Sequence, residues 1–505
     1  MELFTIGFPT ALTWTNILYC FVGVFLGTFV GVLPGISGLT AVALLLPLSF
    51  HLEPATAIIM LGGLYYGAEY GGSTASILLN LPGTASNAVT CLDGYPMTQQ
   101  GRAGPALFIT SIASFVGAAI GTILMVLLAP PLARFALSFQ SSEYFSAMLF
   151  GLVAAGTIGR GPRIKSIAMV ILGMTFGLIG IDTNTGVFRF TFGSPNLYDG
   201  FPIVILAMGM FGISEVIASV NRLKYVTDPG QITVRSLLPT RDDMRRIVKP
   251  MMRGAAVGSF FGPLPGTGPT ISSFMAYALE NRVQGSRRKL GTGMVEGIAA
   301  PETANNAAVQ TSFIPTLTLG IPGSATMAIM LGALLVHGIQ PGPRLITQEP
   351  ELFWGVIASF WIGNIFLLML NIPFIGLWVR ILHVPYRFLY PMILCLICIG
   401  VCSVNNSSFD VGLVILFGIL GYGLKLLDFE PAPMLIGFIL GPMVEQNFRR
   451  SLVLTQGDFA ELFTRPVTAF FLIGTAILLL WMVISGLLSA RKKTSETIEK
   501  NIQDG

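Results

Sequence analysis

Charged side chains are scarce in this chain. Asp, Glu, Lys and Arg together make up 11% of its 505 residues, against about 25% in soluble domains. Lys and Arg are absent from residues 1–101. A chain so poor in charge lacks the surface of a water-soluble protein. Its net charge of +4 also provides no extended basic surface, so we expect no nucleic-acid partner.

Signals for ATP use and for metal cofactors are missing too. The sequence contains no Walker-type phosphate-binding loop, so direct ATP drive is not expected. Cys395, Cys398 and Cys402 fall on one face of a predicted helix, but iron–sulfur ligation would need a fourth ligand. We therefore expect these cysteines to pack in the helix interface, and we expect no cofactor.

Apolar residues dominate what is present. They account for 53% of the chain, and apolar runs approach the roughly 20 residues that cross a bilayer along its whole length. Such helices are apolar on nearly every face, which suits lipid. The composition predicts an all-α polytopic membrane protein whose main surroundings are the lipid bilayer.

Four Pro-Gly breaks interrupt these apolar runs. They are Leu33-Pro34-Gly35-Ile36-Ser37, Leu81-Pro82-Gly83-Thr84, Pro263-Leu264-Pro265-Gly266-Thr267 and Ile321-Pro322-Gly323-Ser324. In lipid, a helix is broken only where the freed backbone groups face protein or a water-filled cavity. The breaks therefore predict re-entrant hairpins over 17–50, 73–92, 254–280 and 309–339, with a separate short span over 55–68 before the second.

The order of these features repeats along the chain. A first break at Pro34 and Pro265, an acid at Glu69 and Glu302, and a second break at Pro82 and Pro322 recur in the same sequence. Paired breaks in corresponding positions of two halves are a pointer to a transport site. We therefore predict an internal duplication.

The duplication divides the chain into four parts. They are a first repeat over 1–220, a basic cytoplasmic loop over 221–253, a second repeat over 254–448, and a final span with a basic cytoplasmic tail over 449–505. Basic loops prefer the cytoplasm. Five crossings and two hairpins per repeat then orient the repeats oppositely, although Arg449, Arg450 and Arg465 fall outside. Hairpins in inverted repeats predict elevator-like movement of a transport region against a scaffold.

The hairpin tips and the nearby amides form the candidate substrate site. Half-helix amino termini present unpaired N–H groups and a positive dipole end, which suits an anion. The predicted substrate-binding residues are Pro34, Gly35, Ser37, Pro82, Gly83, Thr84, Pro265, Gly266, Thr267, Pro322, Gly323, Ser324, Asn305 and Asn306.

Oxygen atoms in the same region suit a small cation. The candidates for a Na⁺ site are Glu302, Asn305, Gly35, Gly266 and Thr267. Glu302 has two alternative roles, as a proton carrier or as a structural hydrogen-bond partner. Glu69 and Glu296 are expected at a helix amino terminus or at a cavity rim. The breaks have a simpler alternative as helix kinks, with the polar residues bonding between helices.

Two other function classes stay open. Gly35-Ile36-Ser37-Gly38 looks like the Gly-x-Ser-Gly of rhomboid-type intramembrane serine proteases. A nucleophilic serine needs a neighbouring base, and the matching tip, Gly266-Thr267-Gly268, has no serine. Re-entrant loops also line pores, so a channel, or a carrier for another small solute, is the main alternative.

Several longer motifs stand in a fixed order. They are Gly31-Val32-Leu33-Pro34-Gly35-Ile36-Ser37-Gly38, Gly67-Ala68-Glu69-Tyr70-Gly71-Gly72-Ser73, Pro301-Glu302-Thr303-Ala304-Asn305-Asn306-Ala307 and Gly338-Ile339-Gln340-Pro341-Gly342-Pro343. With these motifs the chain resembles the large membrane subunit of tripartite tricarboxylate transporters, of the TctA type, over essentially its whole length.

The resemblance implies a carrier and not an enzyme. It implies a multi-pass protein of the bacterial inner membrane that works with a small membrane subunit and a periplasmic solute-binding protein delivering a tri- or dicarboxylate. It also implies uptake driven by a cation gradient, with Na⁺ expected rather than H⁺. Bringing a trianion inward against about 100 mV costs roughly 7 kcal/mol, so accumulation needs co-transported cations.

Overall fold

The protein is helical nearly throughout. The computed structural model describes residues 1–33, 37–157, 163–182, 184–219, 237–285, 289–381, 386–405 and 407–503. Among these residues the only sheet is a short antiparallel pair, β1 (Gly180–Ile181) with β2 (Phe188–Arg189). The all-α prediction is confirmed.

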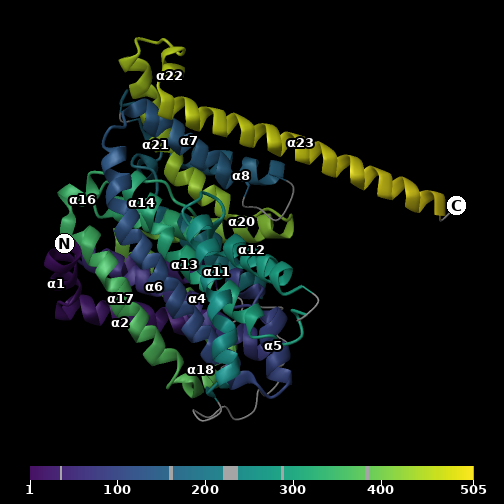
Figure 1. Cartoon of the computed structure of the whole chain (residues 1–505). Helices are drawn as coiled ribbons and strands as arrows, with labels where there is room; N and C mark the ends of the chain where they lie inside the picture. The colour runs from purple at the N-terminus through teal and green to yellow at the C-terminus, as the bar shows by residue number, and fades with distance from the viewer. Residues whose placement is uncertain are drawn as a thin grey trace. The chain divides into compact units, whose positions relative to one another are not determined.

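Two compact units make up the fold. The first comprises Met1–Leu137 with Pro202–Tyr422, and the second comprises Ser138–Phe201 with Gly423–Gly505. The second unit contains α7 (Ser141–Ala155), α8 (Arg163–Gly177), η3 (Pro195–Leu197), α21 (Ala432–Leu454), α22 (Glu461–Thr464) and α23 (Pro466–Gln503). The described parts of the four Pro-Gly breaks lie in the first unit, of which Figure 1 labels several helices, such as α2, α4 and α13.

Membrane-spanning helices are present in the described part of the chain. Those long and apolar enough to cross a bilayer are α2 (Trp14–Val32), α6 (Ala103–Ala136), α17 (Pro350–Asn371), α20 (Ser408–Leu426) and residues Pro466–Ile484 of α23. Large apolar side chains on these helices, such as Leu127 and Phe470, are exposed. Since exposed apolar surface on this scale suits lipid, the chain is a multi-pass membrane protein, as predicted.

The remaining elements of the first unit are shorter or more polar. They are η1 (Leu3–Gly7), α1 (Phe8–Ala11), α3 (Gly38–Ser49), α4 (Pro54–Leu79), η2 (Ser86–Ala88), α5 (Cys91–Gln99), α9 (Ile203–Ala207), η4 (Met208–Ile213), α10 (Ser214–Ser219), α11 (Arg241–Phe261), α12 (Gly268–Gln284), α13 (Glu296–Thr311), α14 (Phe313–Leu319), α15 (Ala325–Val336), α16 (Leu345–Gln348), α18 (Ile375–Ile381) and α19 (Tyr386–Asn405). Every residue of α13 is buried, and so is almost all of α4. These two helices are the core of the unit.

A ridge of small residues allows α2 to lie directly on α4. Gly23, Gly27 and Gly31 recur every fourth residue, and a Cβ added at Gly27 would lie only 2.3 Å from the carbonyl oxygen of Leu64. Small residues at this spacing let helix backbones touch in a membrane. The carboxyl end of α2 is thereby held against α4.

The second half uses the same device. Gly254, Gly258 and Gly262 form a ridge on α11, and a Cβ at Gly258 would lie 2.1 Å from the carbonyl oxygen of Ala304 in α13. In both halves the ridge ends just before a Pro-Gly break. This matched packing accords with a duplicated unit, while the opposite orientation of the repeats stays a prediction.

Each half also contributes a long span to the central helix of the other half. On α6, a Cβ at Gly117 would lie 2.2 Å from the carbonyl oxygen of Thr303 in α13. On α17, a Cβ added at Gly363 would lie 2.0 Å from the Tyr66 hydroxyl oxygen of α4. Figure 1 shows α4, α6, α11, α13 and α17 in the same part of the first unit. The two halves are interlocked at α4 and α13.

The helix over 54–79 differs from the prediction of a separate span at 55–68. α4 continues without interruption through Gly71 and Gly72 to Leu79. At Gly71, a Cβ would meet the carbonyl oxygen of Thr28 at 2.3 Å. The glycines therefore serve helix contact here and do not end the helix.

The segment 221–253 also differs from the predicted loop. Residues 220–236 lie outside the described residues, but the chain is helical from Arg241. Thr240 caps this helix, because its Oγ1 accepts a hydrogen bond from the Asp243 N–H at 3.1 Å while the Asp243 carboxylate accepts one from the Thr240 N–H at 3.1 Å. This reciprocal cap starts α11. The sequence predicts a loop here because the segment is rich in basic residues.

Replacing Gly27 by alanine tests the close helix contact. We expect Gly27→Ala to lower the melting temperature of the purified protein, because separating α2 from α4 costs about 1–3 kcal/mol. The control is Gly412→Ala on α20, where an added Cβ meets nothing within 4 Å. Equal melting temperatures for the two variants would contradict the contact.

Candidate functional site

Two carboxylates are buried at the centre of the first unit. Glu69 lies on α4 with 6% of its surface exposed, and Glu302 lies on α13 with 1% exposed. Within the described residues, neither forms an ion pair with Lys or Arg. The hydrogen bonds to the two carboxylates come from hydroxyl and amide groups. This is the pattern of a polar site and not of a structural salt bridge.

Glu302 is surrounded by hydrogen-bond donors. Ser73 Oγ donates to Oε2 at 2.8 Å and Ser114 Oγ donates to it at 3.3 Å, while Oε1 accepts from Thr90 Oγ1 and from Asn87 Nδ2 at 3.4 Å. These donors come from α4, α6 and the segment around η2. Glu302 of the second half is thus held entirely by groups of the first half.

Glu69 binds the second break directly. Its Oε2 accepts from Thr84 Oγ1 at 3.0 Å, from Ser86 Oγ, and from Asn305 Nδ2 at 3.1 Å. Thr84 completes the Pro82-Gly83-Thr84 turn. The carboxylate therefore links one broken helix to α13.

Close backbone contacts bring the breaks of each half together. In the first half, a Cβ at Gly83 would lie 2.3 Å from the carbonyl oxygen of Gly31, at the end of α2. In the second half, the Gly266 N–H donates to the carbonyl oxygen of Gly323 at 3.0 Å. In addition, η2 packs against α12, and α15 packs against α3 and α4. The described parts of the four breaks thus gather around α4 and α13.

The first-half candidates have the following places. Pro34 and Gly35 lie outside the described residues. Ser37 caps α3, its Oγ accepting from the Thr40 N–H at 3.1 Å. Pro82 is exposed, whereas Gly83 and Thr84 are buried. Of these residues only Thr84 contacts a buried carboxylate.

The second-half candidates form a turn and a cap. The Thr267 hydroxyl bonds within its own turn, to the carbonyl oxygen of Leu264 at 2.8 Å. Gly266 and its partner Gly323 are buried, as is Pro322, while Pro265 is half-buried. Ser324 caps α15 by accepting from the Met327 N–H at 3.3 Å. Substrate binding at these positions stays a prediction.

The amides on α13 are only partly satisfied. Asn306 Nδ2 donates to the carbonyl oxygen of Glu302 at 3.0 Å. Asn305 Oδ1, Asn306 Oδ1 and both polar atoms of Gln310 are buried and have no hydrogen-bond partner among the described residues. Since buried polar atoms are nearly always paired, these positions are where a bound solute or ion would find free ligands.

Several residues of the site escaped the sequence analysis. Ser86 bonds to the Glu69 carboxylate. The others bond to the Glu302 carboxylate, and they are Ser73, Asn87, Thr90 and Ser114. Ser86, Asn87 and Thr90 do leave a signal, because they follow the second break at helical spacing within a largely apolar region. Ser114 leaves none, since its role arises only from the packing of α6 on α13.

Comparison with known proteins identifies the family. The model of the "Tripartite tricarboxylate transporter TctA family" matches residues 17–436. The chain belongs to the TctA family. This is a family of transporters and not of enzymes, so the protease alternative is excluded. Within a tripartite tricarboxylate transporter, this chain is a membrane subunit.

Two relatives from Agrobacterium vitis have no assigned function. One, described as an uncharacterized 52.8 kDa protein in the TAR-I ttuC′ 3′ region, is 46% identical over 489 residues, which is 97% of each chain. The other, an uncharacterized protein in the TAR-II ttuC′ 3′ region, is 50% identical over 212 residues, covering 42% of this chain and 88% of its own length. No solved structure matches the chain.

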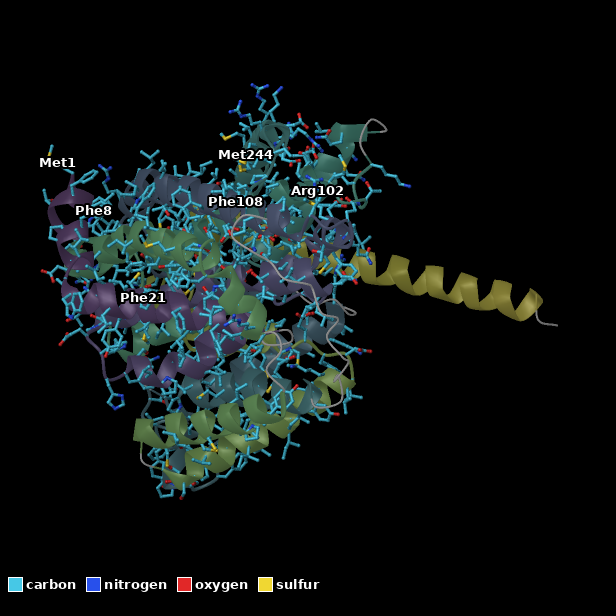
Figure 2. All side chains as sticks on the ribbon, turned by 90° about the horizontal axis from the view of Figure 1, so that it is seen from below. Met1, Phe8, Phe21, Arg102, Phe108 and Met244 are labelled. Carbon is cyan, nitrogen blue, oxygen red and sulfur yellow. The ribbon has the colours of Figure 1, made fainter. Side chains whose placement is uncertain are left out.

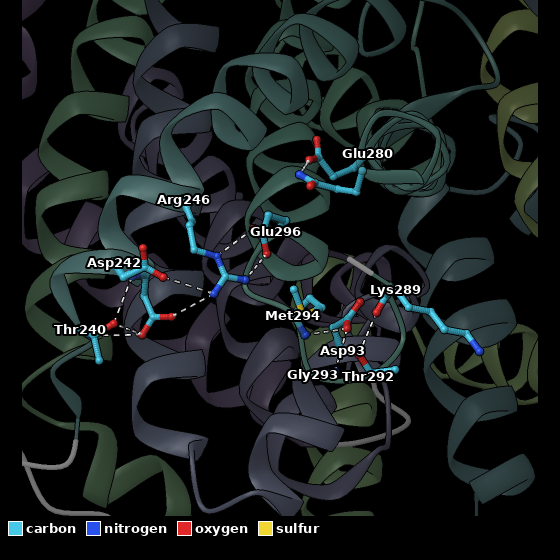
Figure 3. A network of polar contacts seen from close by, with 12 residues as sticks. Asp93, Thr240, Asp242, Arg246, Glu280, Lys289, Thr292, Gly293, Met294 and Glu296 are labelled. Carbon is cyan, nitrogen blue, oxygen red and sulfur yellow. Dashed lines mark hydrogen bonds and ion pairs between the residues drawn. The ribbon is translucent and has the colours of Figure 1, made fainter. Parts of the chain in front are cut away.

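A second polar network of the TctA chain fixes α11, α12 and α13 next to the site. Arg246 binds Glu296 in a bidentate pair, with Nε to Oε1 at 2.9 Å and Nη2 to Oε2 at 2.8 Å (Figure 3). Arg253 binds Glu280 in the same way at 2.9 and 2.8 Å. Glu296, which the sequence suggested at a helix amino terminus or at a cavity rim, is the first residue of α13 and is part of an ion pair that holds the start of this helix.

Asp93 anchors the loop before α13. Its buried carboxylate accepts from the backbone N–H groups of Gly293 and Met294 at 2.8–2.9 Å (Figure 3). It also accepts from the Gly291 N–H and from the Tyr277 hydroxyl, each at 3.0 Å. A carboxylate surrounded by backbone N–H groups is strongly stabilised. Asp93 therefore holds α5 of the first half to the loop between α12 and α13.

A third contact joins α6 to α11. Arg102 Nη2 lies 2.9 Å from both carboxylate oxygens of Asp243. Figure 2 labels Arg102 and Met244, the residue that follows Asp243, in the same region. Burial alone would raise the pKa of Asp243, but the hydrogen bonds from Thr240 and Arg102 outweigh it and lower the pKa below its usual value. Asp243 is therefore ionised at neutral pH and stabilises the start of α11.

Removing the charge of Arg246 tests this network. Arg246→Met removes the guanidinium that pairs with both carboxylate oxygens of the buried Glu296. Breaking a buried ion pair costs about 3–5 kcal/mol, so we expect a clear fall in melting temperature. The control is Arg245→Met, since the neighbouring Arg245 is exposed. Thermal unfolding of both purified variants measures the difference, and a fall of the same size in both would contradict the assignment.

Proposed function

We propose that this chain is the translocating subunit of a secondary transporter that imports tri- or dicarboxylates, such as citrate-like anions, together with Na⁺. The observation that carries this proposal is the pair of buried carboxylates, Glu69 and Glu302, among the Pro-Gly breaks. Polar atoms buried without partners on α13 support it. Buried acids near broken helices mark ion and substrate pathways in membrane proteins.

The breaks offer binding groups for an anion. The helices α3, α12 and α15 each begin just after a break, so their first N–H groups and positive dipole ends point into the break region. Ser37 and Ser324 add hydroxyl groups at two of these ends. A carboxylate bound there would be neutralised by helix ends, because no lysine or arginine pairs with Glu69 or Glu302 among the described residues.

Cations are needed for both the binding and the transport of such an anion. A trianion moved inward against about 100 mV costs roughly 7 kcal/mol, and the site already contains two carboxylates. Na⁺ entering with the substrate offsets both terms. The unpaired amide oxygens of Asn305 and Asn306 suit an alkali cation better than a proton, because a proton needs one acceptor and a metal ion needs several.

Membership of the tripartite family supports our proposal for the partners and the location. We infer a small membrane subunit, a periplasmic solute-binding protein that delivers the carboxylate, and a bacterial inner membrane as the site of action. The described parts of the four breaks lie in one compact unit. This supports an elevator-like movement, because a substrate site contained in one unit is able to move as one body.

Reconstituted uptake tests the proposal. We expect proteoliposomes containing this chain, the small subunit and the binding protein to accumulate labelled citrate when Na⁺ is higher outside, with saturation and with no uptake if the binding protein is omitted. Flux that needs no gradient would contradict a carrier and indicate a channel. A panel of di- and tricarboxylates in the same assay identifies the preferred substrate.

Two variants test the central residues. Glu302→Gln and Asn305→Ala each remove ligands or charge at the site, so we expect initial uptake to fall by at least about tenfold, as loss of a charged hydrogen bond predicts. The control is Asn371→Ala on α17, whose Nδ2 bonds only to the Leu367 carbonyl oxygen of its own helix. Membrane insertion of all three, measured by detergent extraction and monodispersity, should equal wild type. Wild-type uptake by either central variant would contradict its role.

A further inference from the structure

We propose that Glu69, Thr84, Ser86, Asn87 and Asn305 form a binding site for one alkali cation of the size of sodium. The part that this site plays in coupling rests on the proposed function, whereas its ability to bind the ion rests on the geometry alone. Of these residues, only Asn305 was among the cation candidates from the sequence. The proposal therefore assigns the cation to the Glu69 carboxylate and not to Glu302, which was the carboxylate candidate from the sequence.

Four oxygen atoms crowd together at the second break. Thr84 Oγ1 lies 2.5 Å from Asn87 Oδ1, 2.7 Å from Ser86 Oγ and 3.0 Å from Glu69 Oε2. Ser86 Oγ also contacts Glu69 Oε2. All four side chains are buried, with exposures of 6% or less. Water is thus not the main neighbour of these oxygens.

There are too few hydrogen atoms for these contacts. The four oxygen–oxygen contacts need four hydrogens, but the hydroxyls of Thr84 and Ser86 supply one each and an ionised carboxylate and an amide oxygen supply none. Two contacts therefore place lone pairs against lone pairs. A protonated Glu69 would add one hydrogen and still leave one contact without any. A cation among the oxygens removes the repulsion.

The orientation of Asn87 is fixed from its other side. Its Nδ2 donates to Ser73 Oγ at 2.8 Å and to Glu302 Oε1 at 3.4 Å. A flipped amide would point Oδ1 at the Glu302 carboxylate, which repels it. Oδ1 must therefore face Thr84. In this arrangement Glu302 is a positioning residue that aims an amide oxygen into the cation site.

Asn305 provides an independent sign of a missing ligand. It is 1% exposed, and its Nδ2 donates to Glu69 Oε2 at 3.1 Å. Its Oδ1 has no hydrogen-bond partner in the part of the chain that the structure describes. Leaving a buried acceptor unpaired costs about 1–3 kcal/mol. The Asn305 amide already contacts Glu69 Oε2 through its Nδ2. A rotation of this one side chain therefore brings its Oδ1 to an ion bound at Glu69.

The ligands define the charge of the ion. One carboxylate and otherwise neutral hydroxyl and amide oxygens balance a single positive charge, and hard oxygen ligands select a hard cation. The second carboxylate, Glu302, is already committed to four donors and so does not add its charge directly to the site. A monovalent alkali ion meets these conditions, and a divalent ion does not.

Sodium-dependent stability of the purified full-length chain in lipid nanodiscs tests the site. At constant ionic strength with choline chloride as the replacement salt, NaCl should raise the wild-type melting temperature with saturation, because an ion that binds only the folded state stabilises it. Glu69→Gln should abolish this dependence. Thr84→Val and Ser86→Ala should each raise the half-saturating NaCl concentration by about tenfold or more, as loss of one ligand to an ion predicts.

The control and the contrary results are as follows. Thr122→Val removes a buried hydroxyl that bonds only to the Ala118 carbonyl oxygen of its own helix, so it should keep the wild-type dependence on NaCl. Unchanged half-saturation in both Thr84→Val and Ser86→Ala would overturn the site, even if Glu69→Gln did not fold. So would a wild-type protein that responds to pH and not to NaCl.

Uptake measurements separate this site from the proposed function. Sodium-driven carboxylate uptake that survives Glu69→Gln would overturn the site and leave the transport proposal standing. Sodium binding that depends on Glu69, in a protein whose uptake ignores the Na⁺ gradient, would keep the site and overturn coupling. Each outcome therefore falls on one proposal only.

Discussion

Burying two acids without a basic partner is the constraint on which the rest of this structure depends. An isolated carboxylate in a low-dielectric interior is very costly, so Glu69 and Glu302 require donors or ions on every side. Hydroxyl and amide groups supply them, and they come from both halves of the chain. The site therefore exists only when the two halves are packed against each other.

That requirement explains the small residues that line the central helices. Hydroxyl groups are short, so α4 and α13 have to approach their neighbours closely for Ser73 or Thr84 to reach a carboxylate. Glycines such as Gly27 and Gly258 allow backbone contact at distances that any side chain would prevent. Lipid gives little hydrophobic driving force between helices, so close packing and interhelical hydrogen bonds hold this arrangement together.

The sequence predicted the parts of this site that leave a local pattern. The membrane class, the family and the breaks around Pro82 and Pro322 are all visible in short stretches of residues. The donors Asn87 and Ser114 were missed, because their partners lie more than a hundred residues away and only the packing of α6 and η2 on α13 brings them to Glu302. The start of α11 at Arg241 was missed because a segment rich in basic residues is typical of a loop.

The surroundings of the two carboxylates imply a division of tasks. Glu302 already accepts hydrogen bonds from four donors, so it serves best to orient the groups around it. Glu69 faces oxygens that compete for too few hydrogens, so it stays incomplete without a further positive charge. The amide of Asn87 links the two, since one end binds Glu302 and the other faces the cluster on Glu69. An ion in the proposed site at Glu69 would therefore act on Glu302 through Asn87, and on α13 through Asn305.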